Sequence, residues 1–519
     1  MIIADLYKNT SMNQMQVALT TIGIVVACWI MYIQHGWIND DSVIYFETAR
    51  LFSIGEWKLA AQQFPWPFYP LLIAAVHYFT SLDFQQSAQI LNVALLALAI
   101  HSMLQIIILA GGDKLSLVFA ALLFFSTTYI VGDVLPMLLR DQGFWAFLLS
   151  AIIFLIRFYR QHNIRDAFYW QLLALIALLF RTETITYIAL LPLVLLFKPD
   201  IPISTKARNF FCAYMLYAGL AGLALIAASL HGLLGLQDLE HVKDTFMNMS
   251  KIHDFSAEIA AKAQTMATAV LGEPLADFAW LGLILTLTSI AVVKCMTVAG
   301  ITPLILTVLN YNNIKCNMAH DVHRILSFVS LVAFINAIII ILQVNILSNR
   351  YVIFFGLILL IFATFSARIL LKKWQLKQLT KIEIVIVILV TALVTIGSIL
   401  NLRPKDAGYN YEQKAVSYIK AEQAKNHETS KVFYTSPRTR YYGGEAYIGR
   451  GYDHWEFTNQ AINDGSIYQY DFLAINLNIN DQSAEREKIL AEKLPQYVLV
   501  KTFYGYKNKK RVLVYKKVD

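Results

Sequence analysis

The sequence predicts a mainly α-helical protein, a polytopic bundle of about 11–13 transmembrane helices with a small C-terminal extracytoplasmic α/β domain. Of its 519 residues, 57% are hydrophobic and 15% are charged, whereas soluble domains carry about 25% charged residues. Stretches such as 90–110 and 325–347 contain no Asp, Glu, Lys or Arg, and about 20 apolar residues are enough to cross the hydrocarbon layer as a helix. Because the apolar residues form continuous blocks and do not alternate with polar ones, helices are favoured over a barrel.

The apolar blocks define the membrane domain, residues 1–402. They predict spans near 16–35, 85–110, 115–133, 143–159, 168–181, 184–197, 209–233, 278–309, 325–347, 351–371 and 382–402. The block 278–309 is too long for one straight crossing and is interrupted by Lys294, so we expect a tilted or broken single crossing there. The stretch 17–33 has no small-residue cleavage site after it, which indicates a retained first span and not a signal peptide.

Basic loops orient the chain. Arginine and lysine cluster in 157–166, 198–208 and 372–381, and such loops normally face the cytoplasm. Because each span changes the side of the membrane, the N-terminus is then predicted inside. The loops 36–84, 134–142, 234–277 and 348–350 and the tail 403–519 are predicted outside. The sequence thus predicts a multi-pass protein of the bacterial inner membrane with a periplasmic C-terminal domain. The net charge of +8 lies largely in short loops between spans, so it does not indicate a nucleic-acid partner.

The tail 403–519 is polar and rich in tyrosine, and its pattern predicts a small periplasmic α/β domain. Helices are expected at 411–425 and 484–494. Strands are expected at 432–435, 472–477, 497–503 and 512–515, with a hairpin tip at 507–509.

The notable charges gather at the outer ends of spans, which favours chemistry at the outer water–lipid boundary. The first cluster is Asp40 and Asp41, just outside the first span and at the start of an amphipathic helix. A carboxylate here could be the general base for an acceptor hydroxyl. The alternative is that Asp40, Asp41 or Ser42 caps the helix, and the two roles can coexist.

A Pro-rich aromatic segment, 65–70, follows in the same outer loop, and the apolar stretch 71–79 after it is short for a span. Parity also argues against a crossing, so we expect 71–79 to form an interfacial helix. Trp66 and Tyr69 suit the level of the lipid headgroups.

Two further pairs combine an arginine with an acid. Arg140 and Asp141 open the fourth predicted span, and Arg181 and Glu183 form the apex of a hairpin of two short helices. Because these helices are too short to cross the whole hydrocarbon layer, we expect the apex to lie below the outer surface. Charges at that depth need to be paired or to face a wet cavity. Structural ion pairs are the alternative interpretation of both motifs.

The last cluster is Arg350 and Tyr351, between two long apolar spans at the outer boundary. The planar fork of an arginine suits phosphate oxygens. A snorkelling arginine beside an interfacial tyrosine is the alternative.

Together these motifs resemble the GT-C superfamily of integral-membrane glycosyltransferases, in particular the protein O-mannosyltransferases and the lipid A aminoarabinose transferases. The resemblance covers about residues 15–400. Its signposts occur in order: Asp41 with Tyr45 four residues later, Pro65–Pro70, Arg140–Asp141, Arg181–Glu183 and Arg350–Tyr351. The acidic pair here is Asp-Asp, where Asp-Glu is common in the superfamily, so either Asp40 or Asp41 remains a candidate base.

The resemblance implies an inverting transfer of sugar from a polyprenyl-phosphate donor at the periplasmic face. Asp41 would be the base, and Asp141 would orient the acceptor or share that role. Donor phosphate would be bound by Arg350 with Tyr351, by Arg181 and by Arg140; Tyr45 and Glu183 would support the site. No cofactor is required. A divalent metal near the acids is compatible with this scheme, but the sequence gives no sufficient ligand set. The hypothesis requires Asp41, Asp141 and Arg350 to converge on one pocket.

Two other classes remain open. A transporter of lipid or solute with an accessory outer domain would place charges near the bilayer midplane and show inverted repeats, and neither pattern is present in the sequence. A non-catalytic scaffold would tolerate replacement of Asp41 and Arg350. The expected partners are a lipid-linked sugar, membrane lipids and an acceptor that is a glycan, a lipid or a protein. The sequence specifies neither the sugar nor the acceptor.

Overall fold

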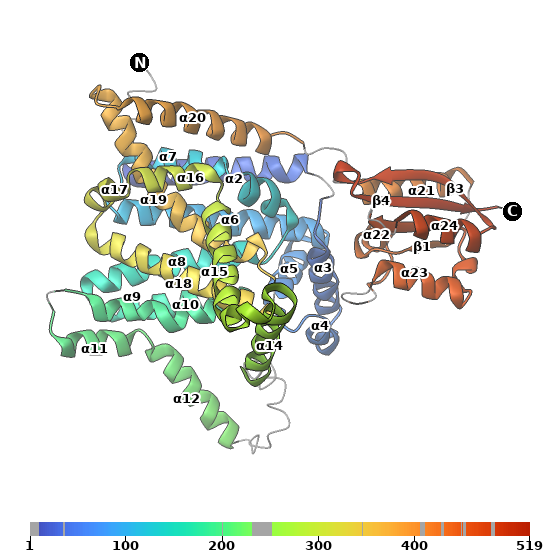
Figure 1. The fold of residues 1–519 in the computed structure, drawn as a ribbon, viewed down its shortest axis with the longest axis horizontal. Helices are drawn as coiled ribbons and strands as arrows, with labels where there is room; N and C mark the ends of the chain where they lie inside the picture. The colour runs from blue at the N-terminus through green and yellow to red at the C-terminus, as the bar shows by residue number, and fades with distance from the viewer. Residues whose placement is uncertain are drawn as a thin grey trace. The chain divides into compact units, whose positions relative to one another are not determined.

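The computed structural model describes residues 10–34, 37–199, 201–230, 252–344, 346–404, 410–426, 430–447, 449, 453–478 and 483–518. Contacts divide the chain into two compact units (Figure 1). The first unit comprises Met1–Ile24, Leu95–Val131 and Asp141–Leu400. The second comprises Val25–Ala94, Gly132–Arg140 and Asn401–Asp519, so the segment 36–84, predicted to be the first outer loop, groups with the C-terminal domain. The domain boundary predicted at residue 402 stays a prediction.

Seven helices among the described residues are long and apolar enough to cross a membrane, so the chain is a multi-pass membrane protein. They are Met12–Ile33 (α2), Phe84–Leu109 (α6), Asp141–Gln161 (α8), Glu273–Thr297 (η5 and α15), His320–Gln343 (in α18), Asn349–Gln375 (α19) and Lys381–Asn401 (α20). An eighth arises if α7, Lys114–Phe125, and the segment Thr128–Met137, bent by 56° to it, form one span. The predicted fold class is confirmed.

Three other predicted spans correspond to shorter helices. Helix α9 is Ile164–Phe180 and α12 is Met215–Leu230. Between them α10, Thr184–Leu190, passes into the 3-10 helix η3, Leu191–Phe197. The proline at the start of η3 accounts for this change, because a proline has no N–H for the helical ladder. The total of 11–13 spans therefore stays a prediction.

The long apolar block 278–309 contains a break, as the sequence predicts. Helix α15, Ala279–Thr297, ends just before Gly300, whose φ of +88° suits a glycine. Helix α16, Ile301–Leu309, follows, and α17, Tyr311–Asn317, continues the chain. Of the outer loop predicted at 234–277, residues 234–251 lie outside the described residues, and α14, Ile252–Thr265, forms part of the remainder.

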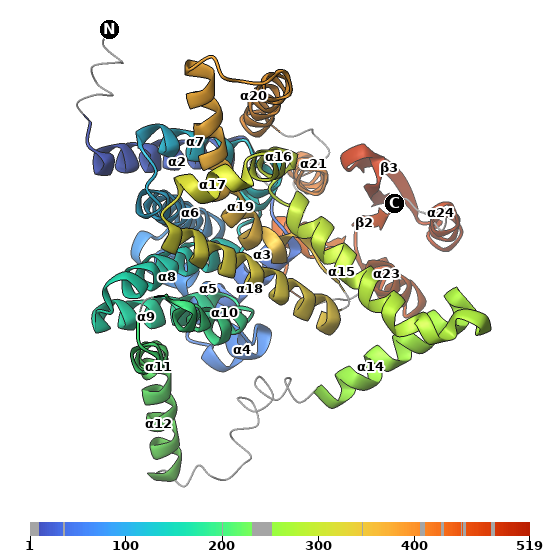
Figure 2. The same ribbon diagram turned by 60° about the vertical axis from the view of Figure 1, so that its left-hand side comes forward.

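The core of the first unit is built around α8 and α19. In each of these two helices, 83% of an apolar stretch of 18 residues is buried, a larger share than in any other candidate span. Helix α9 packs along α8, while α7, α16 and α18 pack on α19 (Figure 2). These contacts fix the ends of α8, α9 and α19, where the predicted charged motifs occur.

The second unit contains α3 (Asp40–Ser53), α4 (Trp57–Gln63) and α5 (Phe68–Thr80) with the C-terminal domain. That domain has a four-stranded sheet in the order β1-β2-β4-β3, in which β1 pairs parallel with β2 and the other pairs are antiparallel. The strands are Val432–Tyr434, Phe472–Asn478, Tyr497–Tyr504 and Lys510–Lys517 for β1 to β4.

Helices cover both faces of this sheet. Helix α21, Tyr411–Asn426, packs on one face, and α23 and α24, His454–Asn463 and Ser483–Lys493, pack on the other. The predicted α/β domain is thus confirmed. Helices α22, Pro437–Gly443, and α23 have no counterpart in the sequence-based prediction.

Candidate active site

The acidic pair occupies the first turn of α3, and other residues cap this helix. Asn39 is the N-cap, and its side-chain oxygen accepts a hydrogen bond of 2.9 Å from the N–H of Asp41. Ser42 completes the capping box by accepting from the N–H of Asn39 at 3.2 Å, and its hydroxyl donates to the carbonyl of Met137. The alternative in which Asp40 or Asp41 is the N-cap is therefore wrong, whereas Ser42 does take part in the cap.

Asp40 is held by an arginine of the C-terminal domain. The Nε atom of Arg438 lies 3.0 Å from Asp40 Oδ1 and 2.8 Å from Glu412 Oε2. The side chain of Asp40 is 55% exposed, while that of Glu412 is 4% exposed. The other oxygen of Glu412 accepts from Ser436 Oγ and from Asn476 Nδ2, both at 2.7 Å. The guanidinium of Arg438 therefore connects the buried polar network around Glu412 to Asp40 at the start of α3.

This network favours a charged arginine and a neutral histidine. Burial opposes the charge of Arg438, but Glu412 and Asp40 together raise the pKa of its guanidinium above the ordinary value. His454 begins α23 beside the same groups. Burial lowers the pKa of His454, and this effect outweighs the opposite influence of Asp40 and Glu412.

Tyr45 connects the acidic turn to the aromatic segment. Its side chain is buried, and its ring lies edge-on to Phe64 and Tyr69, with centroids 5.1 and 5.2 Å apart. The guanidinium of Arg140 lies 5.3 Å from the centroid of the Phe64 ring. Phe64 is therefore in contact with both Tyr45 and Arg140, two of the residues that the sequence assigns to the site.

Tyr69 is a core residue of the second unit. It is fully buried, and its hydroxyl donates to Asn92 Oδ1 at 2.6 Å, while the Asn92 amide donates to the carbonyl of Leu139 at 3.2 Å. The expectation that Tyr69 anchors the chain at the lipid headgroups is therefore wrong. A buried tyrosine needs a partner for its hydroxyl, and Asn92 provides it.

The first unit brings together Arg181, Asp141, Glu183 and Tyr351. Arg181 follows the last residue of α9 and donates through Nη1 to Asp141, the first residue of α8. Its Nε and Nη2 donate to the two oxygens of Glu183 at 3.2 and 2.6 Å. The guanidinium lies 4.7 Å from the centroid of the Tyr351 ring. Arg181 and Asp141 are both buried, as expected for paired charges below the outer surface.

In this cluster one arginine is shared between two carboxylates. Two carboxylates face one guanidinium, and three nitrogen atoms of Arg181 already donate to them. These contacts favour the structural ion pair that the sequence left as an alternative. The assignment of Arg181 to the donor phosphate stays a prediction.

Arg350 lies in the first turn of α19, and the residue before it, Asn349, contacts a lysine of α15. Ser348 caps this helix and accepts from the N–H of Arg350 at 3.4 Å. In α15, Lys294 donates through Nζ to the side-chain oxygen of Asn349 at 2.8 Å. Lys294 was recognised in the sequence only as an interruption of an apolar block. Its charge is the signal that could have placed it here, because a lysine in a span needs a polar partner.

The predicted site residues therefore form two groups, one in each unit. Asp40, Asp41, Tyr45 and Arg140 belong to the second unit, and Asp141, Arg181, Glu183, Arg350 and Tyr351 belong to the first. Convergence of the two groups on one pocket stays a prediction. Within the described ranges, no three His, Cys, Asp or Glu side chains are grouped so that they could hold a metal ion. Independence from a cofactor also stays a prediction.

Comparison with solved structures finds a similarity to ArnT from Cupriavidus metallidurans bound to undecaprenyl phosphate. The match has a TM-score of 0.38 and 11% sequence identity, and it covers 96% of this chain and 97% of that chain. The TM-score and the sequence identity are low, so this match assigns no role to any residue of this chain. No protein-family model matches the sequence, and no curated protein matches it.

Proposed function

We propose that the protein is a membrane glycosyltransferase that moves a sugar from a polyprenyl-phosphate donor to an acceptor at the periplasmic face of the inner membrane. One observation supports this proposal above the others. Asp40 and Asp41, the motif expected to supply the base, lie in the first turn of α3. Asn39 caps this turn, and Arg438 forms an ion pair with Asp40. Rigid placement of a carboxylate is what general-base catalysis requires, since the base must stay within hydrogen-bond reach of the acceptor hydroxyl.

Asp41 is the proposed base. Arg438 contacts the carboxylate of Asp40, so Asp40 already has a structural role at the start of α3. The spacing to Tyr45 also points to Asp41. In the proposed step, Asp41 accepts the proton of the acceptor hydroxyl while the hydroxyl oxygen forms a bond to the anomeric carbon. The bond from that carbon to the phosphate oxygen breaks with inversion, and polyprenyl phosphate leaves.

Arg350 is the proposed main ligand of the donor phosphate, and Lys294, which contacts the neighbouring Asn349, is a second candidate. The leaving phosphate gains negative charge in the transition state, and fixed cations stabilise that charge. Arg140 is a further candidate from the second unit. We assign Arg181 to a positioning role, because it binds Asp141 and Glu183 and would hold Asp141 where it orients the acceptor.

The function is tested by deleting the gene and analysing lipids and surface glycans by mass spectrometry. Loss of one glycan substituent, together with accumulation of one polyprenyl-phosphate sugar, is expected; that sugar lipid then identifies the donor. The purified protein in nanodiscs should release polyprenyl phosphate from this donor when an extract containing the acceptor is added. The Asp41→Asn variant should not.

The transporter alternative gives a different result in the same experiment. A transporter moves its cargo without cleaving it, so the sugar lipid would stay intact in nanodiscs with wild-type protein and acceptor. That outcome would reject the glycosyltransferase. Reporter fusions test the proposed orientation: positions 162 and 376 should report a cytoplasmic location and position 450 a periplasmic one.

A further inference from the structure

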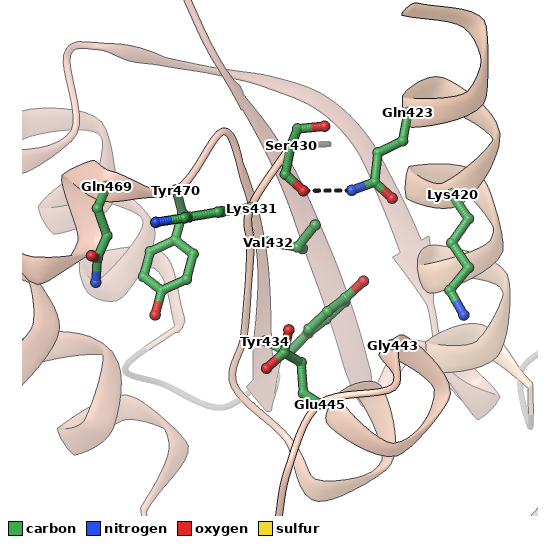
Figure 3. A pocket seen from close by; sticks show the side chains of 10 residues that line it. All are labelled: Lys420, Gln423, Ser430, Lys431, Val432, Tyr434, Gly443, Glu445, Gln469 and Tyr470. Carbon is green, nitrogen blue, oxygen red and sulfur yellow. Dashed lines mark hydrogen bonds between the residues drawn. The ribbon is translucent and has the colours of Figure 1, made fainter. Parts of the chain in front are cut away.

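A pocket of about 470 Å³ lies at the free edge of the sheet in the C-terminal domain (Figure 3). Lys420 and Gln423 of α21 border it, on the side of the sheet that α21 covers. Tyr470 also borders it, and its ring packs on Phe433, which faces the opposite side, with centroids 5.3 Å apart. A pocket bordered from both sides of a sheet must lie along the edge of its outer strand, β1.

Two residues of β1 point their backbone N–H and C=O groups toward this pocket. The N–H of Phe472 donates to the carbonyl of Lys431 at 3.2 Å, and the N–H of Thr435 donates to the carbonyl of Ala474 at 3.3 Å. Because alternate residues of a strand face its neighbour, Val432 and Tyr434 point their N–H and C=O groups away from β2. In the part of the chain that the structure describes, no strand pairs with β1 on that side.

The polar side chains around this edge have a positive balance. The pocket is lined by two lysines, Lys420 and Lys431, and by one acid, Glu445. Lys420 donates to the carbonyl of Tyr442 at 2.7 Å, and Gln423 donates to the carbonyl of Ser430 at 2.7 Å, so both side chains are held in place. Figure 3 shows Lys420 and Lys431 on opposite sides of Val432. A ligand along β1 would therefore lie between two ammonium groups.

We propose that this groove binds an extended acidic peptide segment, which pairs with β1 as a fifth strand. An added strand needs N–H and C=O groups at every second residue. Val432 offers both groups and Tyr434 offers its N–H, whereas the C=O of Tyr434 already accepts from Arg440 Nη1 at 3.5 Å. The volume lies in the range of about 300–1,000 Å³ that is usual for small ligand sites, which suits a few residues. The lysines complement acidic side chains of the segment. This inference is independent of the proposed glycosyltransferase activity.

Binding is measured by fluorescence anisotropy with the full-length protein in detergent. The probe is a capped, fluorescein-labelled pentapeptide of alternating glutamate and valine. Saturable binding is expected. The same peptide with N-methyl groups on its alternate amides, which cannot donate to β1, should bind about fivefold more weakly for each hydrogen bond removed.

Two protein variants locate the site. Val432→Pro removes the outward N–H of Val432 without touching the bonds to β2, and proline is tolerated on edge strands; we expect about fivefold weaker binding. Lys431→Glu should weaken binding about tenfold at low salt, and it keeps the proposal testable if Val432→Pro does not fold. The matched control is Lys488→Glu on α24, whose side chain is 78% exposed and lies outside the pocket; it should bind as the wild type does.

Three outcomes would overturn the proposal. Equal binding of the N-methylated peptide would show that the backbone of β1 is not used. A sulfated hexasaccharide that binds with the same dependence on Lys431, where the peptide does not bind, would assign the pocket to an anionic sugar. No saturable binding of the peptide at about 1 mM would show that the short strand and its lysine only protect the edge against pairing.

Discussion

Arg438 and Asp40 form an ion pair with 3.0 Å between Nε and Oδ1, and this pair joins the predicted catalytic loop to the C-terminal domain. The same guanidinium contacts the buried carboxylate of Glu412. Because an exposed ion pair adds little stability by itself, the contact with Asp40 matters chiefly for position. It fixes the first turn of α3, in which Asp41 is the next residue. In the proposed reaction, the C-terminal domain would help to position Asp41 through this contact.

Removing Arg438 should destabilise the second unit. Arg438→Ala leaves Glu412 buried without its cation, and breaking a buried pair in this way costs about 3–5 kcal/mol. Since the side chain of Arg438 is 18% exposed, we expect about 3 kcal/mol, measured by unfolding in detergent with a probe in the C-terminal domain. Asp40→Asn is the control: it keeps the pair with Glu412 and should change stability by less than about 1 kcal/mol. Equal losses in both variants would show that Asp40, not Glu412, is the important partner.

Asp41 and Asp40 should differ in their effect on turnover. Asp41→Asn removes the proposed proton acceptor and should lower kcat by about 10²- to 10⁴-fold, with donor binding preserved. Asp40→Asn removes only the contact with Arg438 and should lower kcat by less than about tenfold. Steady-state kinetics with the donor identified by lipid analysis provide the measurement. Full turnover by Asp41→Asn with loss in Asp40→Asn would exchange the two roles.

The sequence shows the charged motifs of the candidate site, but it does not show the partners of their side chains. The motifs Arg140–Asp141 and Arg181–Glu183 are local, so charge and hydropathy reveal them. The contact between Arg438 and Asp40 joins residues far apart in the chain, and no periodic pattern reports it. The short helix α22 that carries Arg438 does have a signal, because Ser436, Pro437 and Thr439 form a capping box with proline at its start. This pattern gives the helix but not its neighbour.

For the fold, too, the sequence predicted some features and missed others. Long apolar helices and the strands of the tail were predicted because burial in lipid or in a sheet imposes a strong pattern on the sequence. Helix α23 was missed because it is short, and it begins at His454 after a polar segment. The burial of Tyr69 was missed because Pro-rich aromatic segments suit both a lipid interface and a core. Only the hydrogen bond to Asn92 distinguishes the two environments.

Arg181 should be essential for stability in the first unit. Arg181→Met removes the guanidinium that pairs with the buried carboxylate of Asp141 and also contacts Glu183, with an expected loss of about 3–5 kcal/mol. Arg181→Lys should recover only part of this loss, because a lysine cannot contact two carboxylates through a planar fork. Glu183→Gln is the control, since it leaves the pair between Arg181 and Asp141 in place. Thermal unfolding of purified variants measures these changes; a stable Arg181→Met variant would contradict the structural role.

Arg350 should contribute to donor binding more than to folding. Arg350→Ala removes a charged donor to phosphate, and the KM for the sugar lipid should rise about 10- to 100-fold. Lys294→Gln should change KM in the same direction, because its ammonium lies beside the first turn of α19. The matched control is Tyr351→Phe, which keeps a ring beside Arg181 and should leave KM within about threefold of the wild type. An unchanged KM in Arg350→Ala would remove this residue from the donor site.

Gly143 should resist substitution because of the ring of Phe180. A Cβ atom at Gly143 would overlap this ring, which is fully buried. Alanine in place of glycine normally stabilises a helix by up to about 1 kcal/mol, whereas overpacking a core costs about 1–3 kcal/mol. We therefore expect Gly143→Ala to lower the free energy of unfolding.

The matched control is Gly219→Ala in α12, where the added Cβ would meet nothing within 4 Å and stability should be unchanged or higher. Gly143 lies two residues after Asp141, and Phe180 directly precedes Arg181. A displaced ring should therefore also disturb the Asp141–Arg181 pair, and turnover should fall together with stability. If Gly143→Ala instead gained stability as Gly219→Ala does, the close packing of α8 on α9 would not set the geometry of this ion pair.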